Sequence, residues 1–318
     1  MMRAPDFWRR DGAAAHLLGP FAAVTEYLTA RRVARPGWRA PVPVICCGNA
    51  GVGGSGKTPL ALDLGTRLLA RGKAVAFLTR GYGGRQRGVV RVDVRSHDAT
   101  EVGDEALLLA EVAPTFVAPD REAAARAAIS DGADMLVMDD GLQNPGLVKD
   151  CALLVIDGGA GFGNGRALPA GPLRETIIAA AARCRAAVLI GVDATGALAR
   201  LPAGLPVLRA AMQPAGEMSG RRVMAFAGIG RPDKFFATLR EAGAQLAGTR
   251  VFPDHHRFGA NELDRLRREA AALDARLVTT AKDFVRLPPG LRAEVLRFDV
   301  RLAWQAPQAI DALLDTLR

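Results

Sequence analysis

The chain has 318 residues, 49% hydrophobic and 24% charged, so it can fold around a large core, and its length favours two domains. Its net charge of +9 suggests an anionic partner, but only 5% of the residues are aromatic and no long basic run is interleaved with aromatics, which argues against nucleic acid. The four cysteines form no C-x-x-C pair, which argues against a disulfide framework or a zinc site and favours buried thiols in a reducing cytoplasm.

The first 40 residues combine an apolar helical pattern with basic flanks. Seven arginines against three acidic residues give this segment a net charge of +4 (7 − 3). Polar residues and Pro20 interrupt the apolar stretch, so we expect neither a signal peptide nor a spanning helix. Such a segment can lie in the headgroup layer of an anionic membrane, or pack on the core as a helix kinked at Pro20. The apolar residues in question are Leu17, Leu18, Phe21, Val24 and Leu28.

Residues 51–58, G-V-G-G-S-G-K-T, match the phosphate-loop pattern G-x-x-x-x-G-K-[ST]. An apolar stretch at 42–47 predicts a strand before the loop, and leucines at roughly helical spacing predict a helix after it. In that context, backbone N–H groups curl around phosphate oxygens at a helix N-terminus. Lys57 is expected to reach the β- and γ-phosphates, and the Thr58 hydroxyl to bind Mg²⁺. The predicted nucleotide-binding residues are Gly51, Val52, Gly53, Gly54, Ser55, Gly56, Lys57 and Thr58.

Strands and helices alternate beyond this loop. Strands are predicted at 74–78, 89–94, 115–118, 135–138, 152–156 and 187–190, with helices at 104–112, 121–130 and near 174–184. This alternation predicts a parallel sheet covered on both faces. A Pro- and Gly-containing stretch at 201–206 indicates a boundary. A smaller unit is expected after it, with strands near 223–226, 277–280 and 295–299 and helices near 232–241, 260–273 and 307–318.

Two adjacent carboxylates follow the apolar strand at 135–138. Asp139 lies where a Walker-B aspartate holds Mg²⁺ directly or through water, and Asp140 adds a second carboxylate at the same edge. A divalent cation would relieve the repulsion between them. The alternative is a turn capped by the Asp-Asp-Gly sequence.

Several other polar residues leave their roles open. Asp104 follows Gly103 at the start of a predicted helix, where an aspartate commonly serves as an N-terminal cap. His255 and His256 are adjacent; they are catalytic or hydrogen-bonded loop residues, and no further ligands at zinc spacing accompany them. Arg174 and Glu175 are either a phosphate-binding arginine held by its acidic neighbour or a plain surface pair, and Arg121 is open to the same two interpretations.

Taken together, these segments resemble the tetraacyldisaccharide 4'-kinases, the lipid A 4'-kinases of Gram-negative bacteria. The similarity spans about residues 8–285. It rests on seven motifs in the family's order: G-V-G-G-S-G-K-T-P at 51–59, R-G-Y-G-G at 80–84, G-D-E-A at 103–106, D-D-G-L-Q at 139–143, P-A-G-P-L-R-E at 169–175, D-H at 254–255 and T-T-A-K-D at 279–283.

The resemblance implies ATP- and Mg²⁺-dependent phosphorylation of the 4'-hydroxyl of an acylated glucosamine disaccharide 1-phosphate. It implies that Asp104 is the catalytic aspartate, that a histidine orients it, most simply His255, and that Asp139 and Asp140 are also catalytic. It further implies peripheral attachment to the cytoplasmic face of the inner membrane, with no obligate protein partner. The substrate- or phosphate-binding residues it implies are Arg80, Tyr82, Arg121, Gln143, Arg174 and Glu175.

The chain departs from the family in one motif, because Leu142 and Asn144 stand where an aromatic residue and a histidine are usual. The alternative function is a P-loop regulatory or chaperone NTPase acting at the membrane. We predict an α/β fold of the P-loop NTPase type with helices on both faces of a parallel sheet, plus a smaller α/β domain. The expected division is a docking segment at 1–40, a kinase core at 41–205 and a domain at 206–318 that closes over the cleft.

Overall fold

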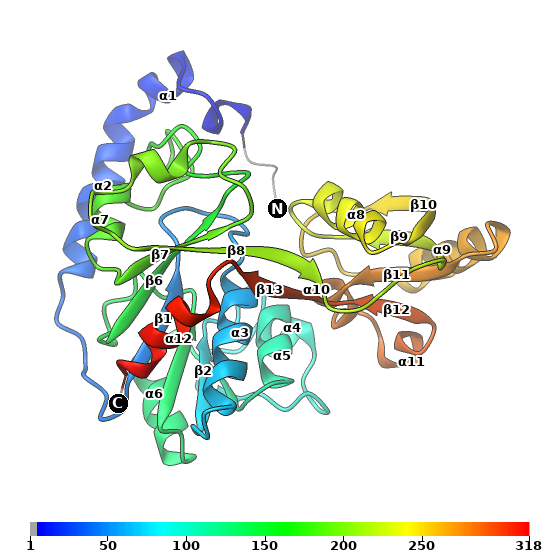
Figure 1. Ribbon diagram of the computed structural model, residues 1–318, viewed down its shortest axis with the longest axis horizontal. Helices are drawn as coiled ribbons and strands as arrows, with labels where there is room; N and C mark the ends of the chain where they lie inside the picture. The colour runs from blue at the N-terminus through cyan, green and yellow to red at the C-terminus, as the bar shows by residue number, and fades with distance from the viewer. Residues whose placement is uncertain (1–4, 318) are drawn as a thin grey trace.

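The computed structural model describes residues 5–317, which form a large and a small lobe (Figure 1). The large lobe contains nine strands: β1 (Val44–Gly48), β2 (Val75–Thr79), β3 (Val90–Arg91), β4 (Thr115–Val117), β5 (Met135–Asp139), β6 (Cys151–Asp157), β7 (Ala186–Ile190), β8 (Val207–Pro214) and β13 (Val300–Trp304). They form one sheet in the order β13-β8-β7-β6-β1-β5-β2-β4-β3. Only the edge strands β13 and β3 pair antiparallel with their neighbours. The central strands are buried along their whole length, as expected of a parallel sheet covered on both faces.

Helices bury apolar stripes against both faces of this sheet. On one face lie α3 (Lys57–Leu69), α5 (Asp104–Ala110) and α12 (Pro307–Asp315), and α3 contributes Leu60, Leu64 and Leu68, spaced four residues apart. On the other face lie α6 (Arg121–Ser130) and α7 (Ile177–Ala181). The predicted helix at 121–130 is confirmed. The strand predicted at 89–94 and the helix predicted near 174–184 are both shorter in the structure, where they are β3 and α7.

The small lobe has its own parallel sheet, in the order β10-β9-β11-β12. Its strands are β9 (Arg222–Ala227), β10 (Gln245–Val251), β11 (Arg276–Thr280) and β12 (Val295–Phe298). Helix α8 (Pro232–Glu241) packs on one face and α9 (Ala260–Ala272) on the other, while the short helices α10 (Ala281–Phe284) and α11 (Pro289–Arg292) follow β11. The predicted fold class, a parallel sheet with helices on both faces plus a smaller α/β domain, is therefore confirmed.

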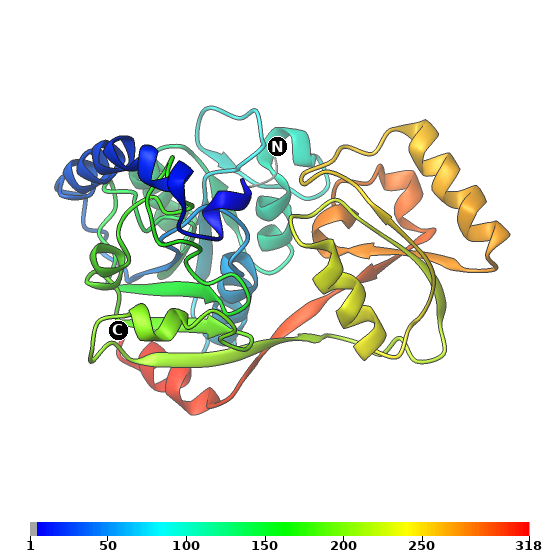
Figure 2. The ribbon, with the colours of Figure 1, turned by 90° about the horizontal axis from the view of Figure 1, so that it is seen from above.

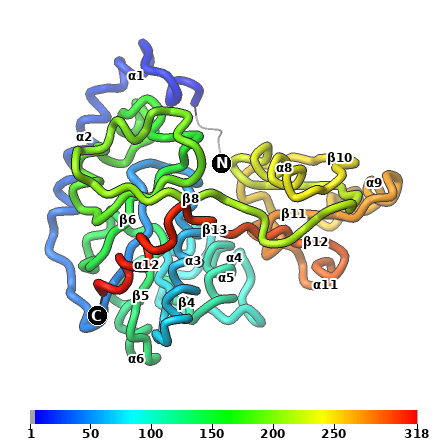
Figure 3. The backbone as a smooth tube through the Cα atoms, viewed as in Figure 1, coloured from blue at the N-terminus to red at the C-terminus, as the bar shows by residue number. Residues whose placement is uncertain are grey.

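The boundary between the lobes does not follow the predicted domain division after residue 205. Strands β8 and β13 and helix α12, all within 206–318, belong to the large lobe rather than to the small one. The first half of β8 pairs with β7, and its second half continues toward the small lobe paired with β13 (Figure 2). The chain thus enters the small lobe along β8 and returns along β13, and α12 lies back on the large lobe (Figure 3). The Pro- and Gly-containing stretch at 201–206 is a loop between two strands of one sheet.

The predicted docking segment at 1–40 begins with four residues that, like residue 318, lie outside the described part of the chain. Helices α1 (Ala13–Leu17) and α2 (Gly19–Val33) run along the rim of the large lobe (Figure 1). Pro20 falls in the first turn of α2, where its missing N–H is not needed, so it begins a helix rather than kinking one. Between residues 5 and 317, no helix is long and apolar enough to cross a bilayer.

One face of these helices is apolar and open to solvent. The exposed fractions are 79% for Leu17, 62% for Phe21, 57% for Val24, 60% for Tyr27 and 57% for Leu28. The helix α2 instead buries small residues of its opposite face, among them Ala22. The core-packing alternative is therefore excluded for four of the five predicted apolar residues, and only Leu18 packs inward.

Candidate active site

Six of the eight predicted nucleotide-binding residues, 51–56, lie in the loop between β1 and α3, and the other two, Lys57 and Thr58, begin α3. Gly53 and Gly56 have φ angles of 109° and 92°, a left-handed conformation that favours glycine. Gly56 also lies against the sheet, because a Cβ atom there would be 2.6 Å from the Cδ1 atom of Ile190. The backbone N–H of Val52 donates to the Pro172 carbonyl at 2.8 Å and fixes the outer side of the loop. The loop therefore presents its N–H groups at the start of α3, a geometry suited to phosphate.

Lys57, Thr58 and Asp139 meet at the end of this loop because β1 and β5 pair in parallel with Cys47 opposite Asp139. The Thr58 hydroxyl donates to Oδ2 of Asp139 at 2.7 Å. Lys57 Nζ donates to Asn49 Oδ1 at 3.3 Å. The other carboxylate oxygen of Asp139, Oδ1, is buried and has no hydrogen-bond partner among the described residues.

The ionised form of the buried Asp139 carboxylate is electrostatically unfavourable. Burial, and secondly the negative charge of Glu105, raise the pKa of Asp139 to about 7, although the Thr58 hydrogen bond and Lys57 oppose the shift. An orphaned carboxylate oxygen beside a hydroxyl is a fitting pair of ligands for Mg²⁺, which takes one or two protein oxygens and completes its shell with phosphates and water. Within residues 5–317, no three His, Cys, Asp or Glu side chains cluster closely enough to hold a metal by themselves.

We predict that Asp139→Asn makes the protein more stable without ligand and abolishes its stabilisation by Mg²⁺ and ATP. The pKa of Asp139 is raised on folding, so this residue's contribution to stability is present below its unfolded pKa and is lost as pH rises toward 7. Each pKa unit corresponds to about 1.4 kcal/mol. The gain in melting temperature should accordingly be small near pH 4 and largest near pH 8. Equal melting temperatures at pH 8, or retained stabilisation by Mg²⁺ and ATP, would contradict this prediction.

Asp140, Arg174 and Gln143 form a polar cluster beside the loop. Arg174 Nη1 donates to Asp140 Oδ1 at 3.1 Å and to Gln143 Oε1 at 3.3 Å, and Lys57 Nζ lies 3.8 Å from Asp140 Oδ2. Burial tends to raise the pKa of Asp140, but the charges of Lys57 and Arg174 outweigh it and lower the pKa. Asp140 adopts a left-handed φ of 57°, which turns its carboxylate toward these cations.

Two further predicted site residues, Arg121 and Glu175, are buried beneath this cluster. Glu175 accepts hydrogen bonds from Gln143 and Arg183, each at 2.7 Å, and so holds Gln143 in place. Arg121 donates to the carbonyls of Ala118 and Asp140, and its Nε has no partner among the described residues. Burial lowers the pKa of Arg121 to about 10. Both residues thus support the backbone and side chains that face the loop.

Asp104 and His255 come from different lobes and meet at the interface. His255 Nδ1 lies 3.3 Å from Asp104 Oδ2, and Asp104 is only 3% exposed. The ring of Tyr82, which is 48% exposed, lies 5.4 Å from that of His255, and Arg80 is exposed at the end of β2. His256 points elsewhere, because its Nε2 lies 2.9 Å from Glu262 Oε2 and its ring stacks on Phe252. Of the two predicted histidines, the structure brings His255 to the aspartate.

Sequence reasoning missed four cations at the lobe interface. Arg286 and Lys282 follow β11 in the small lobe and approach Asp104. On the opposite side of the interface, Asp157 at the end of β6 pairs with Arg231 at 2.6 Å and with Lys234 at 3.6 Å. One available signal was the four-residue spacing between Lys282, within the T-T-A-K-D motif, and Arg286, just after it; in helical geometry this spacing places both residues on one face.

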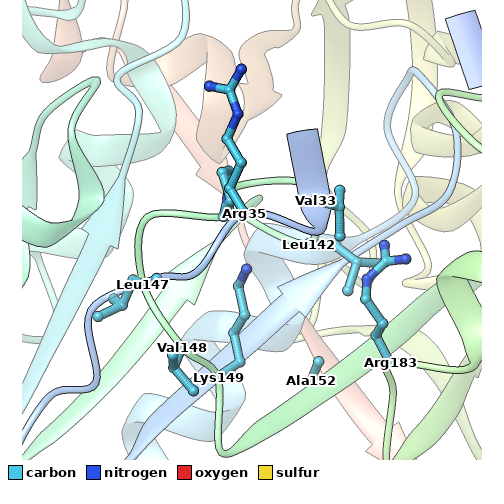
Figure 4. A pocket seen from close by; sticks show the side chains of 10 residues that line it. Val33, Arg35, Leu142, Leu147, Val148, Lys149, Ala152 and Arg183 are labelled. Atoms are coloured by element: carbon cyan, nitrogen blue, oxygen red, sulfur yellow. The ribbon is translucent and has the colours of Figure 1, made fainter. Parts of the chain in front are cut away.

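The two departures from the family motif have structural roles. Leu142 is a core residue that packs against Gly48, where a Cβ atom would lie 2.5 Å from that of Leu142. The Asn144 side chain accepts from the Gly146 N–H at 2.9 Å in a local turn. A cavity of about 210 Å³ lies behind this turn, lined in part by Leu142, Lys149 and Arg183 (Figure 4). No residue of the phosphate loop lines it, so it is separate from that loop.

Comparisons with known proteins point to one family. The family model described as tetraacyldisaccharide-1-P 4'-kinase matches residues 14–318. A tetraacyldisaccharide 4'-kinase of Gluconacetobacter diazotrophicus is 60% identical, with 99% of this chain and 98% of that protein covered, and one of Rhodospirillum centenum is 51% identical over 99% and 97%. The crystal structure of an "apo" form of LpxK from Aquifex aeolicus in complex with ATP has a TM-score of 0.78 and 24% identity, covering 96% of this chain and 99% of that one, and shows the shared fold. The chain belongs to the tetraacyldisaccharide 4'-kinase family.

Proposed function

We propose that this kinase transfers the γ-phosphoryl group of ATP to the 4'-hydroxyl of an acylated glucosamine disaccharide 1-phosphate, with Asp104 as the base. The observation that carries the proposal is that the phosphate loop, the Thr58–Asp139 pair and the Asp104–His255 pair lie at one end of the large sheet, where the lobes meet. The family membership supports the activity, and that geometry supports these roles. A regulatory NTPase, the alternative, gains no support from the comparisons.

The carboxylate of Asp104 is suited to accept the proton of the attacking hydroxyl. A sugar hydroxyl has a pKa of about 15–16, so a positioned carboxylate helps when the proton becomes acidic in the transition state. His255 approaches this carboxylate from the small lobe and is proposed to orient it. Because that contact exists only when the lobes are together, closure completes the site and limits the loss of ATP to water.

The cations around the loop are proposed to hold phosphate groups. Lys57 and Arg174 face Asp140, whose side chain is 34% exposed, so both can turn to a triphosphate without leaving a fully buried charge unpaired. Arg80, Tyr82 and Gln143 are proposed to contribute to binding of the acceptor or its phosphate. Mg²⁺ would be held by Thr58 and Asp139, and when bound it neutralises charge on the β- and γ-phosphates.

One assay tests the activity directly. The purified protein is incubated with Mg²⁺, ATP and the acylated disaccharide 1-phosphate in detergent micelles, and the phosphorylated lipid is quantified. Transfer to the 4' position supports the proposal. No transfer by a protein that still binds ATP would refute it.

We propose further that α1 and α2 dock on the cytoplasmic face of the inner membrane, so that the site meets an acylated substrate without a protein partner. The apolar face formed by Leu17, Phe21, Val24, Tyr27 and Leu28 is exposed, and Arg31 and Arg32 follow it in the last turn of α2. Arginines beside an apolar face favour an anionic bilayer surface.

Replacing two residues of that face by Phe21→Glu and Leu28→Glu should weaken binding to anionic vesicles by about 100-fold. Burial of each large apolar side chain is worth about 1.5–3 kcal/mol, and the new charges face an anionic surface. Vesicle co-sedimentation measures the binding, and the micellar assay should show nearly unchanged kcat. Val251→Glu, at an equally exposed apolar residue of the small lobe, is the matched control. If the double variant and the control bind vesicles alike, this docking surface is wrong.

A further inference from the structure

The Asp104 carboxylate is held by more than His255. Arg286 donates to Asp104 Oδ2 through Nε at 3.0 Å and also through Nη2, and Lys282 Nζ lies 3.8 Å from the same oxygen. Both side chains of the Asp104–Arg286 pair are at most 5% exposed. In such surroundings an ion pair is poorly screened, and its geometry is tightly determined.

Contacts within the small lobe also hold the Arg286 guanidinium in place. Its Nη1 donates to Asp283 Oδ1 at 2.8 Å and to the Gly228 carbonyl at 2.9 Å. Asp283 is fully buried and accepts from the Gly228 N–H and the Thr280 hydroxyl, at 3.0 and 2.8 Å. The guanidinium plane is therefore set by the end of β9 and by the turn after β11, so the small lobe presents it in one orientation.

The same helical turn makes a second contact with the large lobe. Lys282 Nζ donates to Glu105 Oε1 at 3.0 Å, next to the Arg286 contact with Asp104. Between these two cations in the chain, Val285 packs into an apolar cluster with Val102. Asp104 and Glu105, at the start of α5, thus form ion pairs with Arg286 and Lys282, respectively. The two pairs together set the position of the small-lobe turn along α5.

Arg286 also contacts His255, the residue that approaches the Asp104 carboxylate. Its Nη2 lies 3.4 Å from His255 Nδ1, so one guanidinium contacts both the carboxylate and the imidazole. An arginine that served only to join the lobes would not need to contact the histidine.

We propose that Arg286 is a positioning residue of phosphoryl transfer: it aligns the Asp104 carboxylate with His255 and holds it ionised. This inference rests on the proposed role of Asp104 as the base. Burial tends to raise the pKa of Asp104, and the His255 hydrogen bond, Lys282 and Arg286 together outweigh burial and lower the pKa. The charged and titratable groups around Asp104 are Glu105 on its own helix and Lys282, Asp283, Arg286, Asp254 and His255 from the small lobe, with Tyr82 against His255.

The test compares Arg286→Met with Arg286→Lys in the full-length enzyme. Arg286→Met should lower kcat by about 10²-fold, the loss typical of a misplaced catalytic group, while KM for ATP changes less than about twofold. With burial no longer fully compensated, the acid limb of the kcat/KM profile should move up by about 1–2 pH units. Arg286→Lys should recover part of both effects. The matched control is Arg267→Met, which removes a half-buried arginine of α9 that pairs with Asp264 and Glu294, away from Asp104.

Parallel measurements on Asp104→Asn distinguish failure of the proposed role of Asp104 from failure of the proposed role of Arg286. If Asp104→Asn retains full activity, the role of Asp104 fails, and the role of Arg286 fails with it. If Asp104→Asn is inactive but Arg286→Met loses only the activity expected from its unfolded fraction, with an unmoved acid limb, the inference about Arg286 alone is overturned. If the inference holds, adding Arg286→Met to Asp104→Asn costs less than about threefold more, because the residue to be positioned is already disabled.

Discussion

Lys57→Met should lower kcat/KM for phosphoryl transfer by about 10³-fold or more. Lys57 follows the last glycine of the loop, and its side chain is only 12% exposed, so a phosphate bound there would meet a poorly screened charge. Preorganised cations of this kind contribute mainly by stabilising charge that develops in the transition state. Methionine keeps most of the side-chain volume and removes that charge. The measurement is the initial rate of lipid phosphorylation with ATP varied.

The fold should survive this substitution. Lys57 faces Asp140, and that carboxylate keeps its contacts with Arg174 when Lys57 is lost. Lys73→Met, which removes a lysine after the far end of α3, is the matched control and should leave the rate unchanged. Turnover by Lys57→Met above about a tenth of wild type would mean that the loop does not carry the reacting phosphate.

The sequence predicted best the parts of the molecule that are determined locally. The phosphate loop depends on glycines that must adopt positive φ and on the strand and helix that flank it, and all of these lie within about 30 residues. The placement of Asp139 follows from the same reasoning, because parallel strands end at one edge of the sheet. Helices such as 121–130 and 232–241 were predicted with their observed bounds, because caps or proline and apolar spacing mark their ends.

What the sequence could not supply are contacts between distant segments. Strands β8 and β13 pair with each other although about 90 residues separate them, and a short strand carries no local sign of which sheet it will join. The Asp104–Arg286 and Asp157–Arg231 pairs arise in the same way, from the docking of one lobe on the other. In a chain with 42 basic residues, no local pattern distinguishes these arginines from those that remain in solvent.

Asp104→Asn should lower kcat by about 10²–10⁴-fold, the range typical of losing a general base, with little change in ATP binding. The substitution also removes one of the two carboxylates that pair with the buried Arg286 and leaves it Asp283, so it should reduce stability. The pKa of Asp104 is lowered on folding, so its stabilising contribution is present at neutral pH and is lost as pH falls below the ordinary value of about 3.9. The wild-type and variant melting temperatures should therefore differ at pH 7 and converge in acid.

The loss of kcat shows that Asp104 is the base only when it is measured together with the loss of stability. Activity is compared at a temperature where both proteins are folded, and ATP binding is measured separately, so that a loss in kcat cannot be a loss of structure. Asp120→Asn is the matched control, since Asp120 is an exposed aspartate that caps α6 and asparagine caps equally well. A variant that melts lower but retains its kcat would make Asp104 a partner in lobe docking alone. Phosphoryl transfer at this edge would then proceed without a carboxylate base, on phosphate positioning by Lys57 and the loop.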